Sequence, residues 1–171
     1  MRKSVLLIIL LFAAGMTANA QKYALIDMEY ILKNIPAYER ANEQLNQASK
    51  KWQSEVEKVA EEAKTLYTNY QSEAVFLSEE QKGKKEEAIV TKEKEAAELR
   101  RQYFGPEGEL FKKRESLMQP IQDEIYNAVK EISEQKGYSM VVDRASASSI
   151  IFASPQIDIS NEVLSKLGYS N

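Results

Sequence analysis

The fold class of this chain is indicated by the stretch AYERANEQLNQASKKWQSEVEKVAEEAKTLYTNYQSEAVFL, Ala37 to Leu77. Its apolar residues recur in steps of three and four, with mostly polar residues such as Glu, Gln, Lys, Ser and Asn between them. This spacing places the apolar side chains on one face of an α-helix. No proline or glycine occurs between Ala37 and Lys82. We therefore predict a helix of about 40 residues, which is about 60 Å long at about 1.5 Å per residue.

A turn near residues 75–78 is expected to reverse the chain. Ser78 and Gln81 form a capping-box pattern, which is typical of a helix start. In the alternative interpretation Ser78 lies inside the helix and Gly83 makes the turn. The returning helix carries apolar residues seven positions apart, a spacing typical of two helices packed as a coiled coil. These residues are Ile89, Ala96, Tyr103, Leu110 and Leu117.

The segment FGPEG, residues 104–108, interrupts the returning helix with Gly105, Pro106 and Gly108. Inside a helix, glycine and proline cost roughly 1 and 3 kcal/mol relative to alanine. Tyr103 and Leu110 nevertheless remain seven positions apart across the segment, which favours a nearly continuous helix that is kinked at Pro106 and acts as a hinge. In the competing interpretation the helix breaks, with Gly105 as a cap and Pro106 at the first position of a new helix.

The two ends of the chain differ from the coil. Three short strands are predicted there, at Lys22–Asp27, Tyr138–Asp143 and Ile150–Ala153. Asp27 is expected to cap the helical turn that follows it, and Ser160 to cap a final short helix.

The first twenty residues match a secretory signal peptide. Arg2 and Lys3 form a basic start, an apolar run follows around Leu6–Leu11, and Ala18-Asn19-Ala20 is a cleavage signal. A membrane anchor is the alternative, but the apolar run is shorter than the roughly 20 residues that a span needs. We expect cleavage after residue 20 and export to the periplasm of a Gram-negative bacterium.

Composition excludes several functions. The chain of 171 residues has a formal net charge of −3, no histidine and no cysteine. An acidic chain is a poor partner for nucleic acid. Without histidine it lacks the commonest general base and metal ligand, and no phosphate-binding or nucleophile motif occurs. We predict no enzymatic activity, with no catalytic residue, cofactor or metal site.

The predicted domains are a β-rich body, residues 21–35 and 138–171, and a helical hairpin, residues 36–137. So small a body is marginal as a solitary core. We therefore expect self-association, in which strands from several chains complete one body and the hairpins project outward. The strand residues expected at this contact are Tyr23, Leu25, Ile26, Met140, Val142 and Ile151.

Three blocks of the sequence resemble the OmpH/Skp family of periplasmic chaperones. They are KYALIDMEYILKNIPAYERA, LMQPIQDEIYNAVKEISEQKGYSMVVD and DISNEVLSKLGY, in residues 22–41, 117–143 and 158–169. The similarity extends along the whole mature chain, and the FGPEG segment is similar to the form of the family found in Bacteroidetes. The resemblance implies a mainly α fold: a long coiled-coil hairpin, or tentacle, on a small β-rich body that forms a homotrimer.

The same resemblance implies an ATP-independent chaperone that holds unfolded outer-membrane proteins in a cavity between three tentacles. Four aromatic residues beside the hairpin seam are candidates for contact with these clients, whereas Trp52 is expected to pack inside the hairpin. The candidates are Tyr67, Phe76, Phe104 and Phe111. A structural or adaptor coiled coil of the cell envelope is the alternative function.

Basic members of the family suit contact with lipopolysaccharide or lipid. Here the basic cluster near the hairpin turn is interspersed with glutamates, so no lipopolysaccharide site is carried over. The cluster comprises Lys82, Lys84 and Lys85, and the glutamates are Glu79, Glu80, Glu86 and Glu87.

Overall fold

The computed structural model describes residues 21–169. The predicted signal peptide, residues 1–20, lies outside this range. The chain divides into two compact units: a helical one, Leu32–Tyr126, and an α/β one that combines the part up to Ile31 with the part from Asn127 onward. We call the helical unit the arm. The division assigns the last turns of the second long helix to the α/β unit, whereas the sequence prediction had placed them in the hairpin.

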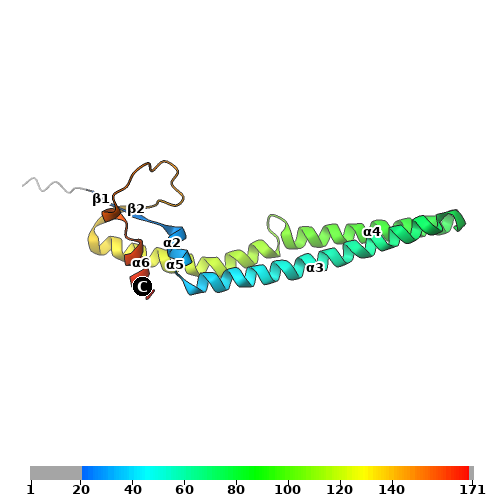
Figure 1. Cartoon of the computed structure of the whole chain (residues 1–171), viewed down its shortest axis with the longest axis horizontal. Coiled ribbons are helices and arrows are strands. Elements are labelled where there is room, and N and C mark those ends of the chain that lie inside the picture. The colour runs from blue at the N-terminus through cyan, green and yellow to red at the C-terminus, as the bar shows by residue number, and fades with distance from the viewer. Residues whose placement is uncertain (1–20, 170–171) are drawn as a thin grey trace, which may run out of the picture. The chain divides into compact units, whose positions relative to one another are not determined.

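The arm contains the predicted antiparallel hairpin (Figure 1). Helix α3, Pro36–Glu73, has 38 residues and begins with Pro36 directly after its N-cap residue Ile35. It buries the small and branched residues of its apolar face, and α4, Glu79–Phe104, buries Ile89. Lys92 of α4 forms ion pairs with Glu62 of α3 at 3.1 Å and with Glu95 at 2.9 Å. The buried residues of α3 are Ala41, Leu45, Val56 and Ala63.

The hairpin turn is the one that the capping box predicted. The chain passes from α3 through the 3-10 turn η1, Ala74–Phe76, and Ser78 is the N-cap residue of α4. The Ser78 hydroxyl accepts a hydrogen bond from the Gln81 backbone N–H at 3.3 Å, and the Gln81 side chain accepts one from the Ser78 N–H at 2.9 Å. Gly83 lies inside α4, so the alternative turn at that residue is wrong.

The predicted continuous, kinked helix across FGPEG is also wrong. Helix α4 ends at Phe104 and α5, Glu109–Lys136, begins five positions later, so the four residues 105–108 form a loop (Figure 1). The extended backbone of Gly105, with φ −63° and ψ 169°, ends α4. The Gly108 N–H donates to the Gly105 carbonyl oxygen at 2.9 Å, and the Gly108 carbonyl accepts the Lys112 N–H at 3.1 Å, which starts α5.

The loop needs both of its glycines because the backbone folds back tightly. A Cβ on Gly105 would lie 2.3 Å from the carbonyl oxygen of Arg101. A Cβ on Gly108 would lie 2.8 Å from the carbonyl oxygens of both Gln102 and Tyr103. Tyr103 and Leu110 therefore lie on two separate helices with the tight loop between them, and their seven-residue spacing was not a sign of a continuous helix.

In the α/β unit, β1, Lys22–Ile26, and β2, Tyr138–Asp143, form a parallel two-stranded sheet. Gly137, with φ +72°, ends α5 directly before β2. Helix α2, Met28–Lys33, follows β1, and Asp27 caps it by accepting the Tyr30 N–H at 2.9 Å, as predicted.

The C-terminal segment packs on the other edge of β1. It contains the 3-10 turn η2, Pro155–Ile157, and helix α6, Ser160–Lys166. The Ile159 N–H donates to the Leu25 carbonyl at 2.9 Å. The buried core of the unit collects apolar residues from its strands and helices: Ala24, Leu25, Ile26, Ile31, Ala128, Ile132, Ile159, Val163 and Leu164.

Two sequence predictions in this unit are wrong. Residues 150–153 form no strand, because this segment pairs with neither strand of the described sheet. Ser160 does not cap α6, whose N-cap residue is Ile159. The Ser160 hydroxyl instead accepts the Asp27 N–H at 2.8 Å and donates to Asp158 Oδ1 at 2.6 Å.

Candidate functional site

The turn of the hairpin carries exposed apolar side chains. Val75 and Phe76 in η1 are 82% and 86% exposed. Tyr67, about two turns earlier on α3, is 48% exposed. Phe76 and Tyr67 were predicted from the sequence, whereas Val75 was missed, although it directly precedes Phe76 in the turn. The structure thus groups three large apolar side chains toward the turn, where they are available to a partner.

The other two predicted contact residues differ in their surroundings. Phe111 on α5 is exposed. Phe104 is partly buried and packs edge-on against Tyr103, with ring centroids 6.4 Å apart. Phe104 therefore belongs at least partly to the packing around the loop.

An aromatic cluster fixes the end of α4 on the middle of α3. The rings of Trp52 and Tyr103 are stacked, with centroids 5.2 Å apart and planes at 10°. The Tyr103 hydroxyl donates to Glu55 Oε2 at 2.6 Å. This hydrogen bond to Glu55, followed by desolvation, raises the pKa of Tyr103 above its usual value. Trp52 thus packs inside the hairpin as the sequence predicted.

A shallow groove of about 410 Å³ lies along α3 and α4. Alanines from both helices, including Ala63 and Ala96, line it, and Tyr67, Lys64 and Arg100 are also among its residues. The groove brings an exposed aromatic ring beside mostly apolar surface, which suits contact with apolar chain segments.

The basic cluster at the turn is neutralised by ion pairs. Lys82 pairs with Glu79 at 2.7 Å, and Lys84 pairs with Glu80 at 2.6 Å. Lys85 pairs with Glu73. The three lysines therefore do not present an unpaired cationic patch for lipopolysaccharide or anionic lipid.

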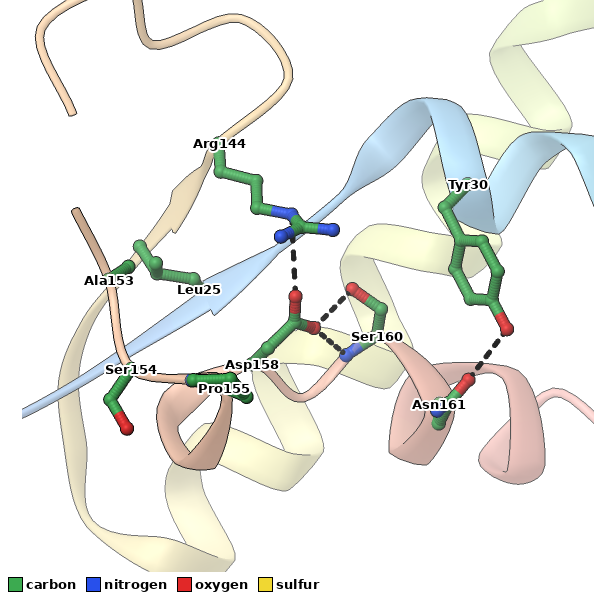
Figure 2. Close-up of a pocket in the computed structure, with 9 residues that line it drawn as sticks. All are labelled: Leu25, Tyr30, Arg144, Ala153, Ser154, Pro155, Asp158, Ser160 and Asn161. Atoms are coloured by element: carbon green, nitrogen blue, oxygen red, sulfur yellow. Dashed lines mark hydrogen bonds and ion pairs between the residues drawn. The ribbon is translucent and has the colours of Figure 1, made fainter. Parts of the chain in front are cut away.

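The predicted self-association residues fall into two groups. Leu25 and Ile26 are buried within the single chain, and Val142 is partly buried. Tyr23 and Met140, which are partners in the sheet register, are about half exposed, and Ile151 is 101% exposed. Phe152, which the sequence analysis did not single out, is 85% exposed beside it. Ala153, the next residue, lines the pocket shown in Figure 2.

That pocket, of about 330 Å³, lies in the α/β unit between the end of β1 and the C-terminal segment. Figure 2 shows Asp158 between Arg144 and Ser160. The Arg144 Nε atom lies 3.4 Å from Asp158 Oδ2. Arg144 also pairs with Asp27 at 3.0 Å. The charge of Arg144 is therefore balanced by two carboxylates. These ion pairs connect the end of β1, the residue after β2 and the C-terminal segment.

Asp143 performs a similar role at the end of β2. Its carboxylate accepts the backbone N–H of Met28 and of Ala145, each at 3.0 Å. Partial burial opposes ionisation, but these hydrogen bonds and those from Ser146 outweigh it and hold the pKa of Asp143 below its usual value. No spacing pattern in the sequence predicts the contact with Met28, because Met28 and Asp143 are 115 positions apart.

Among residues 21–169, no group of His, Cys, Asp and Glu side chains is arranged to hold a metal ion. None of the described helices is both long and apolar enough to cross a membrane.

A long antiparallel hairpin and a small α/β unit built from both ends of the chain define a coiled-coil hairpin protein. More specifically, the chain belongs to the family of OmpH-like outer membrane proteins, whose family model matches residues 22–167.

Two similar proteins extend this finding. The chain is 24% identical over 160 residues to the chaperone protein Skp of Yersinia enterocolitica, covering 92% of this chain and 93% of the relative. Its structure is similar to that of an OmpH-like outer membrane chaperone from Caulobacter crescentus, with a TM-score of 0.69 and 10% identity. That likeness covers 86% of this chain and 83% of the other, and it confirms the predicted fold class.

Proposed function

We propose that this protein is an ATP-independent chaperone that holds unfolded outer-membrane β-barrel proteins in the periplasm. The observation that carries the proposal is the family match, which includes nearly all of the described chain. The similarity to the chaperone protein Skp, which covers more than nine-tenths of both chains, supports the proposal further.

The surface of the arm suits this task. An unfolded client offers many apolar segments, and each contact with an exposed ring or aliphatic side chain contributes at most about 1.5–3 kcal/mol when burial is complete. Several such contacts, from Tyr67, Val75, Phe76 and Phe111, would retain a client without locking it in place. Binding and release then need no nucleotide.

A homotrimer with a client cavity between three arms is part of the proposal. A two-stranded sheet is marginally stable alone, and β1 is the only strand that β2 pairs with in the described part of the chain. The exposed side chains of Tyr23, Met140, Ile151 and Phe152 are available to cover this sheet in a neighbouring copy. We also propose that residues 1–20 are a cleaved export signal.

The test is suppression of aggregation. A urea-denatured β-barrel membrane protein is diluted into buffer with and without the purified mature protein, and light scattering is followed with and without ATP. We expect the protein to suppress scattering equally in both conditions. Unchanged aggregation would contradict the proposal and favour the structural or adaptor role, and suppression that depended on ATP would contradict the passive mechanism.

The contact residues are tested by a double variant, Val75→Ser with Phe76→Ser. Both side chains are largely exposed, so we expect the double variant to fold normally and to hold clients more weakly. Tyr126→Ser is the matched control, because Tyr126 is also exposed but lies on α5 outside the proposed contact set. If the double variant and the control hold clients equally well, the turn of the hairpin is not a contact site.

A further inference from the structure

We infer that Phe152 of one copy inserts its aromatic side chain into the pocket of Figure 2 on a neighbouring copy of the same chain. This inference rests on the proposed homotrimer, and it names a contact that joins the copies. It does not depend on whether the trimer holds clients.

The pocket offers apolar surface that its own chain leaves uncovered. Its volume of about 330 Å³ is large enough for one aromatic side chain, since it falls in the range of about 300–1,000 Å³ that is typical of small-molecule pockets. Figure 2 shows Leu25, Ala153 and Pro155 on one side of the Asp158 carboxylate, and the Tyr30 ring on the other side.

The polar side chains around the pocket already have partners. Arg144 forms ion pairs with Asp27 and Asp158. The Tyr30 hydroxyl donates to Asn161 Oδ1 at 2.9 Å. Throughout residues 21–169, no buried side-chain nitrogen or oxygen lacks a hydrogen-bond partner. An apolar side chain can therefore enter the pocket and leave these interactions intact, whereas a charged ligand would find no unpaired group to bind.

Phe152 is exposed directly beside this pocket. It is 85% exposed, although the next residue, Ala153, lines the pocket. The Phe152 ring therefore does not fill the pocket of its own chain. Ile151 on its other side is also fully exposed. Exposed apolar patches mark contact sites for other proteins, and the Arg144 guanidinium at the pocket can attract the face of an aromatic ring.

A second copy of the chain is the partner that matches this arrangement. Every copy carries one Phe152 and one pocket, so a closed assembly of identical copies uses all of them. Phe152 and the pocket are different parts of the surface, so the contact is head-to-tail. Head-to-tail contacts form a closed ring of copies where the rotation from one copy to the next allows it. The proposed homotrimer is such a ring, and Tyr23 and Met140 are left to cover the sheet.

Photocrosslinking between isotope-labelled copies tests the contact. Phe152 is replaced by p-benzoylphenylalanine, which keeps an aromatic ring at this position. The unlabelled crosslinking chain is refolded together with ¹⁵N-labelled native chain and irradiated, and the crosslinked peptides are identified by mass spectrometry. A ¹⁵N-labelled partner peptide shows that the contact joins two copies. The same replacement at Tyr126, which is also exposed, is the matched control.

We expect position 152 to crosslink to ¹⁵N-labelled peptides that contain Leu25, Tyr30 or Pro155, and position 126 to give no such products. Crosslinks only within one chain would mean that Phe152 closes its own pocket. Crosslinks only to β2 of the neighbour would mean that the ring packs on the sheet, and crosslinks that need an added unfolded protein would make the pocket a client site. Each of these results, or the absence of any crosslink, would overturn the inference.

A second variant blocks the pocket and keeps Phe152. Ala153→Leu adds a larger side chain to the pocket wall, and Ala145→Leu makes the same change at an exposed position that does not line the pocket. Light scattering over a dilution series should show that Ala153→Leu raises the concentration at which the trimer dissociates by at least about tenfold. Ala145→Leu should leave this concentration unchanged, and circular dichroism checks that both variants fold. Equal dissociation of the two variants would contradict the inference.

The outcome is distinguishable from that of the proposed chaperone function. A trimer that suppresses aggregation but gives no crosslink into the pocket refutes this contact alone. A trimer that gives the crosslink but does not suppress aggregation refutes the chaperone function and supports the contact.

Discussion

Replacement of Gly108 by alanine should destabilise the arm by about 1–2 kcal/mol. The new Cβ would lie 2.8 Å from two backbone carbonyl oxygens, and neither oxygen can rotate away as a flexible side chain could. Forcing an extra methyl group into a closely packed site typically costs about 1–3 kcal/mol. Alanine recovers about 0.4–1 kcal/mol by restricting the unfolded chain. The packing cost is the larger of the two effects.

Gly83→Ala is the matched control, because Gly83 lies inside α4 and a Cβ there would meet nothing within 4 Å. Glycine in an open helical position costs about 0.5–1 kcal/mol relative to alanine. The same chemical change should therefore stabilise the arm at residue 83 and destabilise it at residue 108.

Urea unfolding followed by circular dichroism measures both variants against the native protein. All samples need the same protein concentration, because self-association would make the apparent stability concentration-dependent. If Gly108→Ala stabilises the protein as much as Gly83→Ala does, the loop closes into a continuous helix without strain. The kinked helix expected from the sequence would then describe the protein better than the closed loop.

Three further predictions concern other sites. Asp143→Asn should cost about 1 kcal/mol of stability at neutral pH, where the hydrogen bonds to the ionised carboxylate are strongest. Because the folded-state pKa of Asp143 is lowered, this stabilisation is present above about pH 4 and is lost as the pH falls through the folded-state pKa. The free energy of unfolding of the variant should therefore change less below about pH 4 than that of the native protein. Ser78→Ala removes the side-chain cap of α4 and should lower the free energy of unfolding by about 1 kcal/mol, whereas Ser78→Asp should keep most of the stabilisation because aspartate also caps helices. Equal stability of both variants would contradict the capping role. Phe152→Ser with Ile151→Ser should lower the mass measured by light scattering from about three chains toward one, and an unchanged mass would exclude these side chains from the contact between copies.

The long helix α3 and the start of α4 could be predicted from the sequence alone. The apolar spacing after Ala37, the proline at residue 36 and the capping box at Ser78 predicted the extent of α3 and the start of α4. These features are readable because a helix is stabilised by hydrogen bonds and side-chain neighbours within four residues. The strands at residues 22–26 and 138–143 were also predicted from their branched and aromatic residues.

The loop at residues 105–108 and the pairing at the chain ends could not be predicted from the sequence and became apparent from the folded structure. Gly108 is required by its contact with Gln102 and Tyr103, which a seven-residue spacing does not encode. The apolar run at residues 150–153 satisfies the local pattern of a strand but pairs with no strand of the described chain. The Ser160 hydroxyl bonds to the backbone of Asp27, 133 positions away, instead of capping its own helix. In each case the structure depends on a contact with a residue that is distant in sequence, or on the folded path of the backbone. The local sequence pattern therefore cannot distinguish a kinked helix from a loop, a strand from an unpaired segment, or a helix cap from a tertiary hydrogen bond.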